Sequence, residues 1–518
     1  MDIPDLSRRR LLGGAAGLAT LSVLGACTAR SSERRTATGA PGGTLVLGSL
    51  SDIDPKALYS QSISTIAIGL LVFDTLIRYD RATLTPRPSV ATGWEVSADG
   101  RTVRVDLRDD VYFHSGRRLT SADVAYVIER YAANSSASQL QAAAATITSV
   151  DTSMPFRVVL GLAYPLVNLF DLFEFMLLVD RESEEGLTAG TEFVGTGPFR
   201  FSAREVGVRL ELVGNDRYWN GPPLLDGITF RVVRDSSALL TSVRVGQTDL
   251  VLDAAPGQLR RFSDRERFSV QSEDVYDVAY YVGVNVADPA LSNKTLRQAI
   301  SYAVDRDRIV DEVLEGRGSA SSTPWSTSSP AYSEQASRRY SRDLDTARRL
   351  LAAAGGPPGR PVLLSYGTGL AIAPLIAGII QNNLAQIGFR VQLDPREQAS
   401  FSPFLSSGAH QLWINPHGFG QSSPATLATG AAPFKPAKNL SGFTSPEYAS
   451  VVAGFDTLTD PRGPAAIDLY RRYTEILLDE QFVIDLAITT STNVATAAMR
   501  GLNWNAYKYI DAHRVTIN

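Results

Sequence analysis

The residue with the clearest chemistry is Cys27, the only cysteine in the 518-residue chain. It closes the run Leu24-Gly25-Ala26-Cys27, directly behind a short apolar segment near the N-terminus. Small residues before such a cysteine are typical of a leader that is cut there, after which the thiol carries a diacylglycerol through a thioether bond. The alternative is an ordinary signal peptide with an incidental cysteine, which has no second cysteine to pair with. The sequence therefore predicts that Cys27 is lipidated.

The segment before Cys27 predicts export from the cytoplasm. Residues 7–12 place three consecutive arginines behind a serine, and residues 11–26 form an apolar run rich in Gly and Ala. That run is shorter than the roughly 20 residues that a membrane-spanning helix needs. The paired arginines favour the twin-arginine route, with a Sec leader as the alternative. We expect residues 1–26 to be removed and the exported protein to be lipid-anchored to the outer face of the cell membrane.

No set of residues in the chain predicts catalysis. Neither Gly-x-Ser-x-Gly nor His-Glu-x-x-His occurs, and the only cysteine is assigned to the lipid. The acidic pairs Asp109-Asp110 and Glu184-Glu185 lie beside turn residues, which is typical of a solvated surface. We therefore expect no catalytic residue, no cofactor and no protein-bound metal. The alternatives of another class are a lipid-anchored enzyme and a binding protein that serves a sensor.

The charge and the length of the chain restrict its class further. The leader carries three Arg and two Asp, so its removal changes the formal net charge from −4 to −5, which argues against nucleic acid as a partner. Residues 27–41 are small and polar and predict a flexible tether. The roughly 475 residues that follow exceed one ordinary hydrophobic core, so we expect two or more domains.

The hydrophobic pattern mixes strands and helices along this whole body. Alternating apolar residues predict strands, and apolar residues at a period of about 3.6 predict helices. The expected strands are 44–47, 101–108, 208–212, 228–232, 389–393 and 482–484, and the expected helices are 120–128, 296–303, 305–316, 343–354, 375–388 and 465–479. Thr120, followed three residues on by Asp123, predicts a capping box. Residues 318–340 and 398–446 are rich in Ser, Gly, Pro and Ala and predict long irregular stretches.

Six short segments occur in an order that carries a family resemblance. They are 69–80 (GLLVFDTLIRYD), 93–100 (GWEVSADG), 107–123 (LRDDVYFHSGRRLTSAD), 195–199 (GTGPF), 215–220 (NDRYWN) and 294–306 (KTLRQAISYAVDR). With this set the chain resembles the extracellular solute-binding proteins of family 5, which feed peptide, nickel and opine ABC importers. The resemblance runs from about residue 42 to about residue 486, and the ordered set is far more specific than any one segment.

The resemblance implies an α/β fold like that of periplasmic binding proteins, with two α/β lobes joined by a hinge around a ligand cleft. By that analogy lobe I comprises 42–80, 190–275 and 487–518, an inserted domain comprises 81–189, and lobe II comprises 276–486. Such proteins close on a solute by hinge motion and present the closed form to a membrane permease. The expected partners are a small solute, an ABC permease and its ATPase subunits, and we expect a monomer.

One segment departs from the pattern of the peptide-binding members. Those members hold the α-amino group of the ligand with an aspartate of lobe II, inside a Trp-x-x-Asp-Tyr-x-Asp-Pro-like segment. The corresponding residues 412–424 (LWINPHGFGQSSP) place Gly420 at the aspartate, and residues 398–446 contain no Asp or Glu. A buried, unpaired ammonium group would cost several kcal/mol. A free amino terminus therefore needs another acid, and a blocked or modified peptide, an opine-like compound, a glycoside and a metal chelate become alternative solutes.

The predicted cleft contacts are amphipathic or amide side chains close to the expected hinge. They are Trp413, Asn415, His417, Phe419 and Gln421, with Trp325 at the start of lobe II and Tyr59 and Gln61 in lobe I. For each aromatic residue the alternative is packing within a loop. His410 and His417 are two of the four histidines, and their spacing of seven matches no dedicated metal motif. The sequence thus predicts a lipoprotein that captures a peptide or peptide-like solute for an ABC importer, with a nickel chelate or an opine as the alternative.

Overall fold

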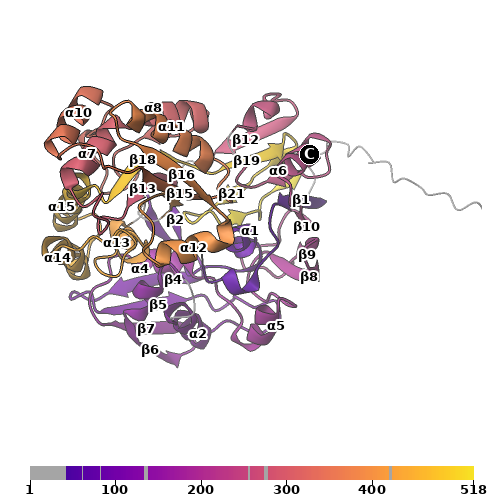
Figure 1. The fold of residues 1–518 in the computed structure, drawn as a ribbon. Helices are drawn as coiled ribbons and strands as arrows, with labels where there is room; N and C mark the ends of the chain where they lie inside the picture. The colour runs from indigo at the N-terminus through magenta and orange to yellow at the C-terminus, as the bar shows by residue number, and fades with distance from the viewer. Residues whose placement is uncertain are drawn as a thin grey trace, which may run out of the picture. The chain divides into compact units, whose positions relative to one another are not determined.

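The computed structural model describes residues 42–60, 62–81, 83–133, 138–254, 257–272, 278–418 and 423–517. Cys27, the leader and the tether therefore lie outside the described residues, and so do Gln61, Phe419, Gly420 and Gln421. The described chain builds three main β-sheets with helices packed against them (Figure 1). Among these residues, no helix combines the length and the apolar character that crossing a membrane requires.

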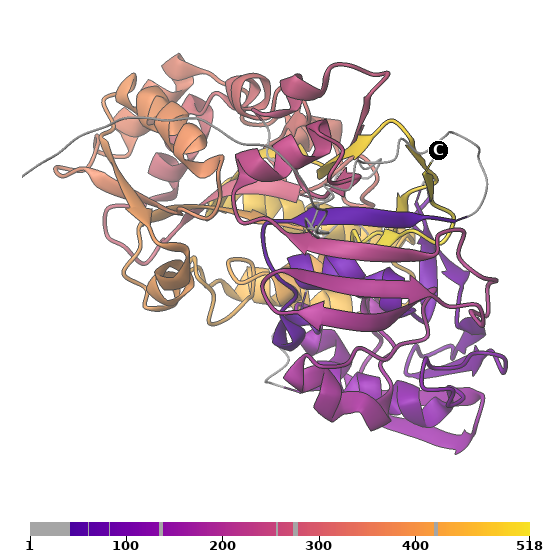
Figure 2. The same cartoon turned by 90° about the vertical axis from the view of Figure 1, so that its right-hand side faces the viewer.

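The first large sheet has seven strands in the order β12-β19-β11-β1-β10-β9-β8. Strand β1 (Thr44–Ser49) lies inside this sheet and runs parallel to β10 and β11 (Figure 2). Leu45 and Leu47 are fully buried on one face of β1, as the alternation predicts. The other elements of this body are β8 (Phe199–Glu205), β9 (Arg209–Gly214), β10 (Gly227–Val232), β11 (Leu250–Val251), β12 (Phe268–Ser272), β19 (Thr492–Thr496), α1 (Ile63–Val72) and α6 (Ser236–Arg244).

The second large sheet has six strands in the order β14-β18-β13-β17-β15-β16. The strands are β13 (Val278–Val284), β14 (Ser319–Ala320), β15 (Val362–Gly367), β16 (Val391–Arg396), β17 (Leu412–His417) and β18 (Val483–Thr489). The helices are α7 (Lys294–Ala303), α8 (Arg306–Arg308), a π-helical turn (Ile309–Val313), α9 (Glu334–Ser337), α10 (Leu344–Ala353), α11 (Ala373–Ala385), α12 (Gln398–Ser406), α13 (Pro424–Gly430), α14 (Pro446–Gly454) and α15 (Pro464–Glu480). Helices α7, α10, α11 and α15 confirm four of the predicted helices, since each buries an apolar stripe.

The prediction of one long irregular stretch at 398–446 is wrong. The stretch contains α12, β17 and α13, and β17 is an inner strand between β13 and β15. A strand that is covered on both faces lacks the alternation of apolar and polar residues by which strands are recognised. In the other stretch, 318–340, the regular elements are only the two-residue β14 and the short α9, so irregular structure is confirmed there.

A smaller, four-stranded antiparallel sheet has the order β4-β5-β7-β6. Its elements and their neighbours are β2 (Ile77–Asp80), β3 (Thr85–Pro88), β4 (Ala91–Val96), β5 (Thr102–Leu107), β6 (Ile147–Met154), β7 (Arg157–Leu162), α2 (Ser121–Ala132), α3 (Gln141–Ala145), α4 (Leu169–Phe175) and α5 (Glu184–Ala189). Thr120 and Asp123 form the predicted capping box of α2. One hydrophobic cluster runs from Leu45 of the seven-stranded sheet through Val105 to Phe175, whereas the six-stranded sheet has separate clusters. The small sheet therefore shares its core with the seven-stranded sheet.

The chain passes between the two large sheets twice. It leaves β12 at Ser272 for β13 at Val278, and it returns from β18 at Thr489 to β19 at Thr492. Strand β18 thus continues beyond residue 486, where the resemblance places the end of lobe II. The chain then adds β20 (Met499–Arg500), β21 (Asn503–Trp504), β22 (Ile510–Asp511) and β23 (Thr516–Ile517). Below, lobe I is the seven-stranded body, lobe II the six-stranded body and the inserted segment residues 81–189; the domain boundaries stay a prediction.

Asp74, a fully buried residue, ties three of the family segments together. Its carboxylate accepts hydrogen bonds from Thr196 Oγ1 (3.1 Å), Tyr218 Oη (3.0 Å) and Trp219 Nε1 (3.0 Å). Arg78 lies 3.6 Å away. Burial raises the pKa of the Asp74 carboxyl, and Arg78 and the three donors oppose that rise. This carboxylate therefore connects the segments 69–80, 195–199 and 215–220 in the folded protein.

Candidate functional site

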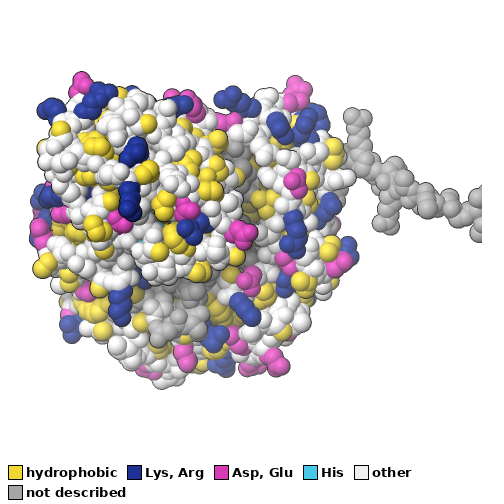
Figure 3. Space-filling view, in the orientation of Figure 1, with side chains coloured by type: hydrophobic (Ala, Val, Ile, Leu, Met, Phe, Trp, Pro, Cys, Tyr) yellow, Lys and Arg dark blue, Asp and Glu magenta, His cyan; other side chains and the backbone are white. Residues whose placement is uncertain are grey.

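The strand ends of the two large sheets face each other across a pocket. In lobe I the parallel strands β1 and β11 end at one sheet edge, where Leu50 and Asp253 follow them. In lobe II the end of β15 and the start of antiparallel β13 share an edge, which carries Leu370 and Tyr280. These residues line a pocket of about 240 Å³, and Figure 3 shows the surface hollowed between the two lobes. Crevices at the carboxyl ends of strands are where open α/β sheets bind ligands.

The walls of this interlobe pocket are mostly apolar. Leu50 is 40 % exposed although it is a large aliphatic side chain, and Ile66, Leu370 and Ile372 extend the apolar lining. The volume lies below the range of roughly 300–1,000 Å³ that is usual for ligand pockets. The pocket therefore suits a small solute with apolar parts.

Two side chains of opposite charge enter the pocket, both from lobe I. Lys508 Nζ donates a hydrogen bond to Ser491 Oγ (2.8 Å), at the second chain crossing. The backbone N–H of Asp253 donates to Asn493 Oδ1 (3.1 Å). Within the described part of the chain, the Asp253 carboxylate itself makes no hydrogen bond or ion pair. A carboxylate without a partner and an oriented ammonium group in the same pocket are complementary to a solute that carries both charges.

Both charged residues have left-handed backbone conformations. The φ angle is +50° at Asp253 and +67° at Lys508. Residues other than glycine adopt such angles rarely, at a cost of about 1–3 kcal/mol that the surrounding structure must offset. Residues of this kind cluster at ligand-binding sites. Their occurrence at both charges of one pocket supports its assignment as the functional site.

Two of the predicted contacts, Trp413 and Trp325, are core residues of lobe II. Trp413 lies on the inner strand β17 and is fully buried, and a Cβ at Gly283 would overlap its ring. The indole Nε1 of Trp325 donates to Thr474 Oγ1 (2.8 Å). Neither indole lines the interlobe pocket. Packing, the alternative considered for the aromatic candidates, accounts for both positions.

The candidates at the end of β17 and the nearby histidine also lie away from the pocket lining. Asn415 is half-buried on β17, and His417 is buried with its Nε2 3.9 Å from Asp485 Oδ1. His410 donates from Nε2 to the carbonyl of Leu440 (2.8 Å), and burial lowers its pKa. Among the described residues, no group of three or more His, Cys, Asp or Glu side chains is placed to hold a metal ion.

The lobe I candidate Tyr59 packs against the inserted segment. Its hydroxyl donates to Glu184 Oε2 (3.3 Å), and burial raises its pKa to about 12. It does not line the interlobe pocket. Gln61, Phe419 and Gln421 lie outside the described residues, so their contact with a solute stays a prediction.

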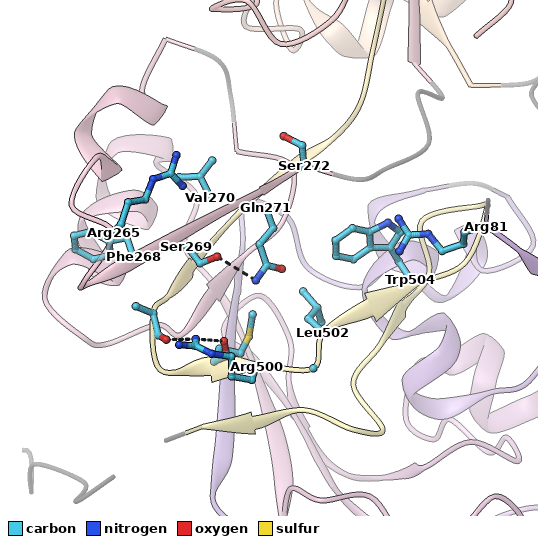
Figure 4. Close-up of a pocket in the computed structure, with 13 residues that line it drawn as sticks. Arg81, Arg265, Phe268, Ser269, Val270, Gln271, Ser272, Arg500, Leu502 and Trp504 are labelled. Carbon is cyan, nitrogen blue, oxygen red and sulfur yellow. Dashed lines mark hydrogen bonds between the residues drawn. The ribbon is translucent and has the colours of Figure 1, made fainter. Parts of the chain in front are cut away.

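A larger hollow of about 660 Å³ is lined by lobe I and by Arg81 at the start of the inserted segment (Figure 4). It is bounded by β12 and by residues 497–504, and the Arg81 guanidinium lies 4.8 Å from the centre of the Trp504 ring. Its lining contains no residue of lobe II. Closure of the lobes would therefore not enclose a solute there, and the smaller interlobe pocket is the better candidate for the functional site.

Sequence reasoning missed Asp253 and Lys508. Asp253 follows the two-residue strand β11, which is too short to be recognised from its pattern. Lys508 lies in a C-terminal stretch whose strands are also only two residues long. The available signal was indirect: binding of a free amino terminus would require an acid outside residues 398–446, and Asp253 is an acid in the pocket lining.

Comparison with known proteins is consistent with this geometry. The family described as "Bacterial extracellular solute-binding proteins, family 5 Middle" matches residues 85–435. The probable di/tripeptide-binding protein 5 of Pseudomonas aeruginosa is 23% identical over 489 residues, which cover 89% of this chain and 92% of that protein. The nickel-binding periplasmic protein of Escherichia coli is 26% identical over 404 residues, which cover 70% of this chain and 73% of that protein.

A solved structure agrees in fold. The ABC transporter-associated periplasmic binding protein DppA of Helicobacter pylori, in complex with the peptide STSA, matches with a TM-score of 0.77 at 21% identity, covering 92% of this chain and 99% of that one. The predicted two-lobed α/β fold is therefore confirmed. The family comprises solute-binding proteins rather than enzymes. Since its profile matches most of the chain, this protein belongs to the bacterial extracellular solute-binding proteins of family 5.

Proposed function

We propose that the protein captures a small peptide or peptide-like solute, with a free amino group and a carboxylate, in the interlobe pocket. The observation that carries this proposal is the pair of opposite charges at Asp253 and Lys508, in a pocket with otherwise mostly apolar walls. The solute's amino group would pair with Asp253 and its carboxylate with Lys508. The apolar walls would take the side chains of the solute.

Asp253 would also provide the acidic partner for an amino group that residues 398–446 lack. Peptide-binding members use an aspartate of lobe II, where this chain has Gly420. Asp253 supplies a carboxylate to the interlobe pocket from lobe I instead. The ammonium group of a peptide then keeps a partner on burial, which removes the physical objection to a free amino terminus. The di/tripeptide-binding relative supports the same class of solute.

A nickel chelate is the less favoured solute. One relative is named for nickel, but neither His410 nor His417 lines the interlobe pocket. His410 is already engaged by a backbone carbonyl. An opine-like compound, which carries carboxylates beside a nitrogen, meets the same two charges as a peptide and stays the alternative solute.

We also infer that the loaded protein delivers its solute to an ABC permease as a monomer. The lipid on Cys27 would keep it at the outer face of the cell membrane, with residues 27–41 as a tether. Such anchoring raises the effective concentration of the protein near the permease. Mass spectrometry of the membrane fraction tests this: Cys27 should carry acyl chains, and Cys27→Ala should release the protein from the membrane.

Calorimetric titration with a leucine-containing dipeptide tests the solute. We expect the free dipeptide to bind, and its N-acetylated and C-amidated forms to bind roughly 10–100-fold more weakly, because each loses one charged hydrogen bond. Asp253→Asn should abolish the preference for the free over the acetylated dipeptide. Asp216→Asn, an exposed aspartate elsewhere in lobe I, is the control. Equal affinity of the wild-type protein for the free and acetylated forms, or tighter binding of a nickel–histidine chelate, would overturn the proposal.

A further inference from the structure

A buried polar contact joins the inserted segment to lobe II. Thr426 of α13 donates from Oγ1 to Asp171 Oδ2 of α4 (2.6 Å), and Asn168 Nδ2 donates to Thr426 Oγ1 (3.0 Å). Tyr79 Oη donates to the other carboxylate oxygen of Asp171 (2.9 Å). Asn168, Asp171 and Thr426 are at most 3% exposed. Figure 1 shows α13 beside α4, although the two helices lie far apart in the sequence.

Apolar and backbone contacts surround this polar contact. Val167 of the inserted segment enters a hydrophobic cluster of lobe II. A Cβ on Gly430 would lie 2.6 Å from the carbonyl oxygen of Gln139, and one on Gly100 would lie 2.9 Å from Thr459 Cγ2. Real Cβ atoms do not approach other atoms so closely, so these positions allow the inserted segment and lobe II to meet at short range. The interface is packed as well as hydrogen-bonded.

This contact must break when the lobes open. The inserted segment shares its hydrophobic core with lobe I, so it moves with lobe I in a hinge motion. Helix α13 packs in lobe II, where Leu427 and Ala428 belong to the core cluster. Opening therefore separates Thr426 from Asp171 and exposes both to water.

We propose that Asp171 and Thr426 form a closure latch that sets the affinity for the solute without touching it. The proposal rests on the proposed function in one respect, namely that capture of a solute closes the lobes.

The latch acts through the equilibrium between open and closed forms. The apparent affinity for the solute is proportional to the fraction of molecules in the binding-competent, closed form. A hydrogen bond to a carboxylate is strong enough for its loss to lower the apparent affinity about tenfold. The open form is unaffected, because the two partners are already apart in it.

Thr426→Val tests the latch, with Thr429→Val as the matched control. Thr429 lies on the same helix, and its Oγ1 donates to the carbonyl of Ala425 within α13 (2.8 Å). Calorimetry with the dipeptide should show about tenfold weaker binding for Thr426→Val and unchanged binding for Thr429→Val. Asn168→Ala removes the second hydrogen bond and should weaken binding about threefold, which keeps the test valid if Thr426→Val folds poorly.

A distance measurement separates closure from solute binding. In a Cys27→Ala background, Val96→Cys of the inserted segment and Ile467→Cys of lobe II provide two exposed positions for spin labels. Without solute, pulsed electron resonance should give longer distances for Thr426→Val than for Thr429→Val. Equal affinities and equal distances would overturn the latch, and so would a lower melting temperature of Thr426→Val with unchanged distances. If the wild-type protein binds no dipeptide, the proposed function fails, while the distances still decide whether the latch exists.

Discussion

Asp74 and Asp171 are both buried carboxylates that accept hydrogen bonds from hydroxyl groups, but they connect different parts of the molecule. The donors to Asp74 all come from lobe I. Asp171 takes one donor, Tyr79, from its own core and another, Thr426, from lobe II. The first junction must hold whenever the protein is folded, and the second only while the lobes are closed. A buried carboxylate with several donors thus joins separate segments of the chain. If all its donors come from one body the junction is fixed, and if one comes from the other lobe the junction can open.

The largest expected effect is that of Asp74→Ala on stability. The substitution leaves Thr196, Tyr218 and Trp219 without their acceptor in a buried place, so we expect unfolding to become easier by about 3–5 kcal/mol. Urea unfolding followed by tryptophan fluorescence measures the change. Asp216→Ala, at an exposed aspartate of lobe I, is the control and should change stability little. Similar losses for both variants would remove the distinction between a fixed junction and an ordinary surface acid.

The second-largest effect is expected in the pH dependence of solute binding, which should depend on Asp171. Burial raises the pKa of Asp171 to about 6, from a usual value of 3.8, and contact with water in the open form would return it toward that value. The protonated carboxyl is therefore favoured in the closed form, and closure is disfavoured as the pH rises through 6. We expect the affinity for the dipeptide to increase about tenfold when the pH falls from 7 to 5.

The control for this pH dependence is Asp171→Asn. Its affinity should stay level over the same range, because the titrating group is gone. Glu174 is the neighbouring buried acid, and burial raises its pKa to about 7. It packs against Ala506 of lobe I, so it stays buried in both forms and should influence stability rather than closure. A pH dependence that persists in Asp171→Asn would assign the effect to another group.

The smallest effect is expected for Tyr79→Phe. This change removes a donor to Asp171 that belongs to the same body, so opening the lobes does not break it. We expect a loss of stability of about 0.5–1.5 kcal/mol and a change in affinity of less than about threefold. Calorimetric titration of Tyr79→Phe and Thr426→Val with the same dipeptide compares their affinities directly. An affinity loss as large as that of Thr426→Val would show that the carboxylate, rather than the contact across the lobes, controls binding.

The regular elements could be predicted where one face of an element is buried and the other is not. Helices α7 and α15 show such a stripe, and so does β1, whose Leu45 and Leu47 alternate with half-buried neighbours. Strand β17 could not be predicted, since its consecutive residues Leu412, Trp413 and Ile414 are all buried and show no alternation. The assumption of a loop there also made Trp413 look like a cleft residue, whereas an inner strand buries it completely.

The charges of the pocket could not be predicted for a different reason. Asp253 and Lys508 lie outside the regular elements, next to two-residue strands, and belong to no recognisable motif. They line one pocket only because β1 and β11 run parallel and the C-terminal segment reaches the same pocket. The sequence indicated that a free amino terminus would need an acid outside residues 398–446, but it did not indicate which acid.

The family, the α/β class and most long helices could be predicted from the sequence, because these depend on short ordered segments and on the local spacing of apolar residues. The position of Asp253 in the interlobe pocket and the hydrogen bond between Thr426 and Asp171 across the lobes follow from the tertiary structure alone. Local patterns state which face of an element is buried, but they do not state which distant segment covers it. The packing of whole sheets and helices determines which distant segments meet, and it sets the positions of the Asp253 and Asp171 carboxylates.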